Sequence, residues 1–517
     1  MISKGLEINE EFRKALDLME NTSKNVFITG KAGTGKSTLL NYFKNMTKKN
    51  VIVLAPTGVA AVNIGGQTIH SFFGFKPDIT VDKIKNLKSK KIKIYKELDA
   101  IIIDEISMVR ADLLDCIDTF LRKYGKIKDV PFGGIQMIFF GDLYQLPPVV
   151  LKHEKNIFNV HYKSPYFFEA KVFKDFEMEF IELEKIYRQK DEKFIEILNT
   201  IRSNTINEKQ IEVLNSLAKK DFKKDNKLVI NLTTINKKAE DINNKYLKDL
   251  KNPIKTYIAT ITGNFDKSYF PAEAELKIAT GAQVMLLNND SKGRWINGTM
   301  GRVVKIINSK KYNCDIICVE LKDGIIAEVT PYTWEIFEYK YNEEKKIIET
   351  ETTGTFTQYP IRLAWAITIH KSQGKTFDNV IIDFSNGTFA HGQAYVAFSR
   401  CTSLDGIFLE RPFKKADIIM DKKIVNFLTN YQYKLSEKNI PKDKKVEIIK
   451  NAIKNKNKIE IVYLKKNDEK TRRIIIPVET GMMEYIGKRF YGLKAYCYQK
   501  KQELIFRIDR ILEIKVL

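Results

Sequence analysis

The sequence predicts an α/β protein with two parallel-sheet domains, a small β-barrel inserted into the second of them, and an α+β tail. Short apolar strands alternate with helical patterns in the first third of the chain, which is typical of a parallel sheet covered by helices. A second set of such strands follows, and a run of short strands and turns interrupts it. The length of 517 residues also exceeds the ~250–300 residues at which a single core stops growing.

The first domain is expected at residues 1–180. A Lys- and Ile-rich stretch near 76–97 indicates a small insertion between its second and third strands. Four apolar runs of strand length predict the sheet. They occupy residues 26–29, 51–55, 100–104 and 136–141.

The second domain is expected in two pieces, 181–297 and 356–435, because the predicted barrel at 298–355 separates them. The barrel prediction depends on short strands joined by tight turns. A charged linker is expected near 435–445, and a compact α+β tail at 446–517. The strands of the second sheet are predicted at 228–234, 380–384 and 407–410.

The chain is strongly basic. It carries 87 Lys and Arg residues against 64 Asp and Glu residues, a formal net charge of +23. An excess of this size favours a polyanionic partner, usually nucleic acid. The alternative is that the cations are spread over solvated faces, as in the Lys-rich run at 442–445. The charge alone does not decide between the two.

The five cysteines have no framework spacing, which indicates reduced thiols in a cytoplasm. Cys314 and Cys318 lie in one predicted strand without a second ligand pair nearby, so a zinc site is not expected. No apolar leader opens the sequence, and no run reaches membrane-spanning length. We therefore expect a soluble cytoplasmic protein without a membrane partner.

Residues 30–37, Gly-Lys-Ala-Gly-Thr-Gly-Lys-Ser, fit the G-x-x-x-x-G-K-[ST] phosphate loop. Glycines let the backbone wrap a triphosphate, and the loop N–H groups and the helix N-terminus point at the anion. Lys36 is expected to reach the β- and γ-phosphates, and Ser37 to hold Mg²⁺. The alternative is a Gly-rich turn that matches by chance. The candidate nucleotide-binding residues are Gly30, Ala32, Gly33, Thr34, Gly35, Lys36, Ser37 and Thr38.

Acidic, amide and guanidinium side chains supply the remaining chemistry. Asp104 and Glu105 end the third predicted strand, where Asp104 can orient Mg²⁺ and Glu105 can polarise a water for in-line attack on the γ-phosphate. Gln145 follows the next strand and is placed to sense the γ-phosphate; the alternative is an ordinary loop that ends in proline. Arg188 and Arg400 lie outside the first domain and can act as arginine fingers across a cleft. Lone arginines are more often surface residues.

Two segments suit single-stranded nucleic acid, because hydroxyls, small residues and a cation at a strand end can grip phosphates without contacting base edges. An aromatic ring can also stack a base, although Phe72 and Phe73 fit core packing equally well. The candidates in the first segment are Thr57, Gly58, Ala60, His70, Ser71 and Phe72. The candidates in the second are Thr368, His370, Lys371 and Ser372, followed by Gln373 and Gly374, which we assign to the nucleotide.

These motifs, in this order, resemble the petite-integration-frequency (Pif) DNA helicases of the RecD-like branch of helicase superfamily one. The resemblance covers residues 8–415. It includes a linking signature at 131–136, Pro-Phe-Gly-Gly-Ile-Gln, which is not expected in general phosphate-loop ATPases, and a last motif at 395–401.

The resemblance implies an ATP- and Mg²⁺-dependent DNA helicase that moves 5′ to 3′ on single-stranded DNA and unwinds 5′-tailed duplex DNA, as a monomer or as a dimer assembled on DNA. Two RecA-like domains would hold ATP between them, and an SH3-like barrel would embrace the DNA. The glutamine with which the family contacts adenine is missing from residues 8–12, so other nucleoside triphosphates are also candidate substrates. The residues that match the catalytic and metal positions of the family are Lys36, Ser37, Asp104, Glu105, Gln145, Arg188 and Arg400.

The tail resembles the WYL domain, a small Sm-like β fold that binds nucleic acid or regulates its neighbour. The matching segments lie at 459–463, 491–496 and 506–511, with Tyr491 and Gly492 in place of the first two residues of the naming triplet. The resemblance implies that Arg473 and Arg507 contact DNA phosphates.

Three other functions stay open at this point. A DNA-stimulated translocase that remodels protein–DNA complexes would share every motif above, because a strand-separating wedge has no motif. A WYL-type regulator with a vestigial ATPase is disfavoured by the intact Lys36, Glu105, Arg188 and Arg400. An RNA helicase is not excluded, since no residue is assigned to a 2′-OH contact.

Overall fold

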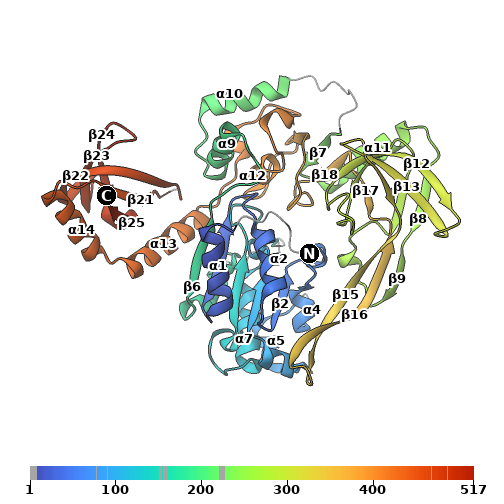
Figure 1. Ribbon diagram of the computed structural model, residues 1–517, viewed down its shortest axis with the longest axis horizontal. Helices are drawn as coiled ribbons and strands as arrows, with labels where there is room; N and C mark the ends of the chain where they lie inside the picture. Colours follow the sequence, from blue (N-terminus) through green and yellow to red (C-terminus); the bar gives the residue numbers. More distant parts are fainter. Residues whose placement is uncertain are drawn as a thin grey trace. The chain divides into compact units, whose positions relative to one another are not determined.

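The computed structural model describes residues 8–517, except 77, 90, 151–153, 155–157, 159, 220–227, 467 and 486. The chain divides into two compact units, Met1–Ile419 and Met420–Leu517 (Figure 1). Within the described part of the chain, no helix combines the length and the apolar character needed to cross a membrane.

A six-stranded parallel sheet opens the first unit, with strand order β3-β2-β4-β5-β1-β6. Its middle strands are buried runs of Val, Ile and Phe, as expected for a parallel sheet that helices cover on both faces. The predicted strands at 26–29, 51–55, 100–104 and 136–141 are confirmed. The strands of this sheet are β1 (Asn25–Gly30), β2 (Val51–Ala55), β3 (Gln67–Thr68), β4 (Ala100–Ile103), β5 (Gln136–Phe140) and β6 (Met178–Leu183).

Several helices of this region pack an apolar face against the sheet. The first of them begins where the Asn9 side chain accepts a hydrogen bond from the Phe12 N–H, and it buries Phe12, Ala15 and Met19. The predicted insertion near 76–97 is helical. The helices are α1 (Glu10–Asn21), α2 (Lys36–Met46), α3 (Gly58–Ile64), α4 (Ile69–Phe73), α5 (Val81–Asn86), α6 (Ile92–Glu97) and α7 (Ala111–Tyr124).

A second parallel sheet has the order β18-β7-β19-β20. Its strands match the predictions at 228–234, 380–384 and 407–410, and β18 was not predicted. The strands are β7 (Ile230–Thr233), β18 (Ala366–Thr368), β19 (Val380–Asp383) and β20 (Ile407–Leu409). The helices of this region are α9 (Glu192–Arg202), α10 (Glu208–Ser216), α11 (Asn236–Asp249) and α12 (Gln393–Phe398).

Antiparallel strands separate the parts of that sheet in the sequence. The five-stranded sheet β14-β13-β12-β11-β17 encloses a core that includes Val284, Trp295 and Ile317. Two of its strands, β11 and β17, flank the range 298–355, so the predicted boundaries of the insertion were too narrow; the SH3-like barrel stays a prediction. The strands are β8 (Lys255–Ile258) paired with β10 (Glu275–Ile278), and β11 (Gln283–Leu286), β12 (Met300–Ser309), β13 (Cys314–Leu321), β14 (Ile326–Val329) and β17 (Ile361–Leu363).

A long hairpin, formed by β15 (Tyr332–Asn342) and β16 (Ile347–Gln358), projects from this region, with β9 (Thr260–Gly263) paired along β16 (Figure 1, yellow). Strand β15 contacts α6 and α3 of the first parallel-sheet region. The hairpin therefore joins the antiparallel region to the first sheet.

The second unit is a five-stranded antiparallel sheet, β24-β23-β22-β21-β25, with two helices. Helix α13 (Lys422–Asn439) belongs to this unit, since Tyr433 Oη donates to the Leu464 carbonyl and Ser436 Oγ to the Ile511 carbonyl. The predicted end of the second domain at 435 and the linker at 435–445 were therefore wrong: most charged side chains there form the exposed faces of helices, and Lys445 is buried. The other elements are α14 (Lys442–Lys454), β21 (Ile459–Leu464), β22 (Lys470–Tyr485), β23 (Lys488–Cys497), β24 (Gln502–Arg507) and β25 (Ile511–Val516).

Candidate active site and nucleic-acid interface

The phosphate-loop motif connects the end of β1 to the start of α2. Gly33 and Gly35 have φ of +82° and +87°, which favours glycine. A Cβ on Gly33 would lie 2.5 Å from the Cβ of Arg188, so the loop backbone packs directly against that residue. The Lys36 ammonium donates to the Gly30 carbonyl at 2.7 Å and the Lys31 carbonyl at 3.0 Å. The backbone N–H groups of this loop and the N-terminus of α2 form a candidate anion site.

The acidic pair follows β4 at the same edge of the sheet. Glu105 has φ 51° and ψ 44°, a conformation that a non-glycine residue rarely adopts and that often marks functional sites. Burial, and then repulsion by Asp104, raises the pKa of Glu105 to about 7. Burial also raises the pKa of Asp104, against the attraction of Lys36. Such shifts are typical of carboxylates with a catalytic task.

The residues present fit Mg²⁺ bound together with a nucleotide. Such an ion takes one or two protein oxygens, with phosphate and water oxygens completing its octahedron. The Asp104 carboxyl group and the Ser37 hydroxyl, at the start of α2, would supply those oxygens. No group of three or more His, Cys, Asp and Glu residues that could hold a metal occurs among the residues described.

Gln373, just after β18, connects the second parallel-sheet region to the acidic pair. Its Nε2 donates to Glu105 Oε2 at 3.1 Å and to Gln145 Oε1 at 3.2 Å. Gln145 in turn donates to Asp142 Oδ2 at 3.3 Å. The structure therefore places Gln373 against the candidate base and the candidate sensor rather than along the phosphate loop.

Arg188 packs against the phosphate loop, and Arg400 lies close to Arg188 and to Glu105. Arg188 donates to the Ser399 carbonyl at 3.1 Å, and Arg400, 1% exposed, donates to Ser399 Oγ at 2.8 Å. Burial, and then the charge of Arg188, lowers the pKa of Arg400 to about 9, while Glu105 acts in the opposite direction. A buried cation, Arg400, and a half-buried one, Arg188, thus lie close together, and the buried one acts on Glu105.

Several residues that were predicted to contact nucleic acid are accessible to solvent. Thr57 is exposed and caps α3 by accepting from the Ala60 N–H at 3.3 Å. Ser71 and Lys371 are exposed, and His70 and His370 are half-buried. These side chains follow β2, β3 and β18, so they lie at carboxyl ends of parallel strands, where open α/β sheets bind ligands.

Four other residues that were predicted to contact DNA are buried, and their assignment to the DNA interface is corrected. Phe72 is 1% exposed and makes edge contacts with Phe73, Tyr95 and Tyr339, so core packing is the correct interpretation. Thr368 and Ser372 are buried, and the Ser372 hydroxyl donates to the Ile369 carbonyl. Gly58 lies under Tyr269, where a Cβ would come within 2.9 Å of its ring.

The hairpin lies across this first segment. Tyr339 Oη accepts from the Val53 N–H at 3.2 Å, and Glu338 pairs with Lys91 at 3.0 Å. Gln67 Nε2 donates to the Phe337 carbonyl. A cavity of about 130 Å³ remains between the hairpin and α3, and its lining includes Ala61, Gly66, Ser71, Tyr269, Phe337 and Thr353.

In the second unit, the two predicted phosphate contacts are engaged internally. Arg473 donates to Thr471 Oγ1 at 3.2 Å and to Cys497 Sγ at 3.5 Å. Arg507 forms a bidentate pair with Asp509, with distances of 3.0 and 2.6 Å. Their role in DNA binding stays a prediction.

Three residues of the site escaped the sequence analysis. The Ala32 N–H of the phosphate loop donates to Tyr395 Oη at 2.9 Å. Arg202, the last residue of α9, pairs with Asp142 at 3.4 Å. Tyr395 and Asp142 stand within sequence motifs of the site, so their positions could have indicated that they belong to it. Nothing in the sequence around Arg202 indicated its partner.

Two family models match the chain: PIF1-like helicase over residues 7–212, and WYL domain over residues 444–516. An ATP-dependent DNA helicase Pif1 from Bdellovibrio bacteriovorus is 31% identical over 439 residues, covering 83% of this chain and 93% of the relative. A Bacteroides sp Pif1 structure in complex with ADP-AlF4 is 39% identical, with a TM-score of 0.76, and covers 83% of this chain and 98% of that one. The Bacteroides Pif1 structure bound to ssDNA is 40% identical with the same coverage and a TM-score of 0.61.

The two parallel sheets, with a phosphate loop and an acidic pair on one and Gln373 of the other bonded to that pair, define a phosphate-loop nucleoside triphosphatase with two RecA-like domains. Within that class, the linking signature at 131–136 and the last motif at 395–401 resemble those of the Pif helicases. With the matches above, the chain belongs to the Pif1-like helicase family and carries a C-terminal WYL domain.

Proposed function

We propose that this chain is an ATP-dependent DNA helicase that moves 5′ to 3′ along single-stranded DNA and unwinds 5′-tailed duplexes. One observation carries the proposal: Gln373 contacts both Glu105 and Gln145, and it stands three residues after the candidate DNA contact His370. A single short segment thus joins the candidate hydrolytic site to the candidate DNA path. The names of the relatives, and the nucleotide and ssDNA in the Bacteroides structures, support the same partners here.

In the proposed reaction, Lys36 holds the β- and γ-phosphates, and Glu105 accepts the proton of the attacking water. Mg²⁺, held by Ser37 and Asp104, would neutralise phosphate charge when bound. Arg188 and Arg400 approach the γ-phosphate from the second RecA-like domain and stabilise the charge of the transition state. Residues 8–12 contain no glutamine, the residue with which the family contacts adenine. We therefore propose that base selectivity is weak.

Hydrolysis is proposed to drive movement because the two DNA segments belong to different sheets. The first follows β2 and β3, and the second follows β18. A change in the contacts that Gln373 makes would shift one segment relative to the other along the strand. Opening one base pair step costs about 1.4 kcal/mol of stacking on average, so a one-base step per ATP is energetically reasonable.

The test is a strand-displacement assay with 5′-tailed and 3′-tailed duplexes, ATP and a competing triphosphate. We expect unwinding of the 5′-tailed substrate only, and no turnover in Lys36→Ala or Glu105→Gln, with DNA binding retained in both. Unwinding from the 3′ tail would contradict the direction. ATP hydrolysis stimulated by single-stranded DNA without any strand displacement would instead support the protein-remodelling translocase.

We further propose that the helicase acts on chromosomal DNA in the cytoplasm, as a monomer or as a dimer assembled on DNA. The basic charge of the chain supports a nucleic-acid partner. Sedimentation with and without a forked duplex would measure the stoichiometry, and a stable dimer without DNA would contradict the proposal.

A further inference from the structure

Helix α12 contacts three parts of the candidate active site along its length. Gly392, the residue before its first turn, lies against the backbone of the loop that carries Gln145, which we call the sensor loop. Within the helix, Tyr395 Oη accepts from the Ala32 N–H of the phosphate loop at 2.9 Å. Arg400 stands two residues after the helix and donates from Nε to one of its carbonyls at 3.0 Å. The placement of α12 therefore determines where the candidate finger stands relative to the phosphate loop.

A segment beyond the last motif holds the start of this helix. It comprises residues 411–419, which follow β20 and which we call the strap. The Gly392 N–H donates to the carbonyl of Ile419, the last residue of the strap, at 3.2 Å. Thr388 Oγ1, in the loop that enters α12, donates to the Asp417 carbonyl at 2.9 Å. The strap thus fixes both the start of the helix and the loop before it.

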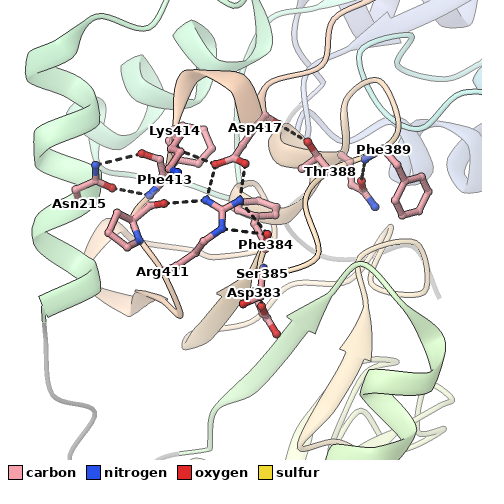
Figure 2. A network of polar contacts seen from close by, with 12 residues as sticks. Asn215, Asp383, Phe384, Ser385, Thr388, Phe389, Arg411, Phe413, Lys414 and Asp417 are labelled. Atoms are coloured by element: carbon pink, nitrogen blue, oxygen red, sulfur yellow. Dashed lines mark hydrogen bonds and ion pairs between the residues drawn. The ribbon is translucent and has the colours of Figure 1, made fainter.

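One ion pair gives the strap its shape, as Figure 2 shows. Asp417 is 6% exposed and forms a bidentate pair with Arg411, at 2.6 and 2.9 Å. The same carboxylate accepts from the Lys414 N–H at 2.8 Å. Arg411 also donates from Nε and Nη2 to the Phe384 carbonyl, at 3.1 and 2.9 Å, just after β19. The pair therefore ties the strap to the second parallel sheet.

The start of α12 has no free space in which to move toward the sensor loop. A Cβ on Gly392 would lie 2.2 Å from the Tyr144 carbonyl oxygen and 2.6 Å from that of Gln145. Gly392 also has φ +72°, which favours glycine. Closely packed structure transmits a displacement instead of absorbing it. A strap that loses its shape would therefore displace α12, the sensor loop, or both.

We propose that Arg411 and Asp417 are positioning residues for ATP hydrolysis, because they hold the strap so that α12 presents Arg400 to the γ-phosphate. The inference rests on the proposed function, since it assumes that Arg400 stabilises the transition state there. A misplacement of about 1 Å far from the reacting atoms can lower a rate roughly 100-fold. A finger acts on charge that develops in the transition state, so its misplacement should lower kcat and leave KM nearly unchanged.

The experiment combines steady-state ATPase kinetics at saturating oligo-dT with affinities for ADP and for ADP–aluminium fluoride, an analogue of the transition state. We expect Arg411→Met to lower kcat roughly tenfold or more, with little change in KM for ATP. It should bind ADP as the wild type does and ADP–aluminium fluoride roughly tenfold more weakly. Asp417→Asn should act in the same direction. Arg411→Lys, which keeps the charge without the planar fork, should restore part of kcat.

Arg122→Met is the matched control for a pair that only stabilises the fold. Arg122 pairs with Asp118 at 2.7 Å and, like Arg411, also donates to a backbone carbonyl, that of Asp129. Both arginine side chains are 27% exposed. Arg122 lies near the end of α7, from which the chain returns to the amino end of β5, opposite the edge with the phosphate loop. This variant should lower Tm about as much as Arg411→Met and leave kcat and both affinities unchanged.

A kcat of Arg411→Met equal to that of the wild type would overturn the inference while leaving the helicase proposal intact. Equal losses of affinity for ADP and for the transition-state analogue would also overturn it, because a general structural defect would then explain the effect. The same holds for equal losses of kcat in Arg411→Met and Arg122→Met. Undiminished hydrolysis in Arg400→Ala, or no hydrolysis by the wild type, would instead contradict the proposed function and the inference with it.

Discussion

At the scale of single residues, the loop that carries Gln145 depends on a cation from another element. The Arg202 guanidinium lies 3.8 Å from the centroid of the Tyr144 ring and pairs with Asp142, which is fully buried. Asp142 also receives the Gln145 amide. Arg202 is therefore a positioning residue: it neutralises the acid that orients the candidate sensor.

Arg202→Met is expected to lower kcat for ATP roughly tenfold or more with a smaller change in KM, because it leaves Asp142 buried without its cation and displaces Gln145. Arg202→Lys should restore part of kcat. Steady-state ATPase kinetics measure both. Arg294→Met is the matched control, because Arg294 also pairs with an aspartate, at 2.8 Å, and stacks on an aromatic ring, at 4.5 Å. A KM effect without a kcat effect in Arg202→Met would contradict the positioning role.

The pKa of Glu105 gives a prediction about pH. Its pKa is raised to about 7 in the folded protein from an ordinary value of 4.5, so the folded state holds this proton more tightly than the unfolded state. Between those values the stability contributed by this group falls as pH rises. Glu105→Gln should therefore raise Tm above the wild type at pH 8 and leave it nearly unchanged at pH 4.5, measured by calorimetry without nucleotide.

In the same pH range, kcat/KM of the wild type should rise with pH along a limb near 7, because the base must be ionised. Glu344→Gln, which alters an exposed acid in the hairpin turn, serves as the control and should change Tm equally at both pH values. A Tm gain in Glu105→Gln that is larger at pH 4.5 than at pH 8 would contradict a raised pKa of Glu105 in the folded protein.

At the scale of elements, the hairpin β15–β16 completes the first sheet as well as covering it. In the part of the chain that the structure describes, β3 pairs with Leu54 and Ala55 of β2 but does not reach Val53. The Val53 N–H donates to Tyr339 Oη of the hairpin. Tyr339 is 6% exposed, so this N–H has little access to water.

Tyr339→Phe is expected to lower the free energy of unfolding by about 1–3 kcal/mol, because it leaves a buried N–H without its acceptor. Urea denaturation followed by circular dichroism measures the change. Tyr332→Phe, at a tyrosine of the same strand that is 41% exposed, should be close to neutral. Equal effects of the two substitutions would show that the Val53 contact does not stabilise the fold.

Elements with a strong local signal were predictable, and elements defined by distant partners were not. Strands β1, β2, β4 and β5 are apolar runs, and the phosphate loop has a fixed spacing, so both could be located from the sequence. Strands β11 and β17 are equally apolar, but only their antiparallel partners reveal that they belong to the inserted sheet. Helix α13 was wrongly divided between the second domain and a linker, because a charged helix face and a charged linker have similar compositions.

The same limit applies to the site. Lys36, Glu105 and Arg400 were located because each stands in a motif with its own spacing. Phe72 was assigned to DNA because a ring near a strand end fits both a base and a core, and only its burial decides. Arg202 is defined by its contact with Asp142, which lies far away in the sequence and which no local pattern specifies.

At the scale of the whole molecule, the charge of +23 does not identify a binding face by itself, because many lysines pair with acids. Lys91 and Lys255, for example, form ion pairs with Glu338 and Asp315. Binding through phosphates has a separate signature, since each contact releases counterions and makes affinity depend on salt. The salt dependence can therefore measure the contribution of Lys371.

For the wild type, the logarithm of the affinity for oligo-dT should fall linearly with the logarithm of the salt concentration. Lys371→Ala should make that slope shallower by about 0.7, the value for one phosphate contact on a single strand. Lys310→Ala, at an exposed lysine of the turn between β12 and β13, should change neither the affinity nor the slope. Anisotropy titrations at several NaCl concentrations measure all three proteins, and an unchanged slope in Lys371→Ala would exclude a phosphate contact at that residue.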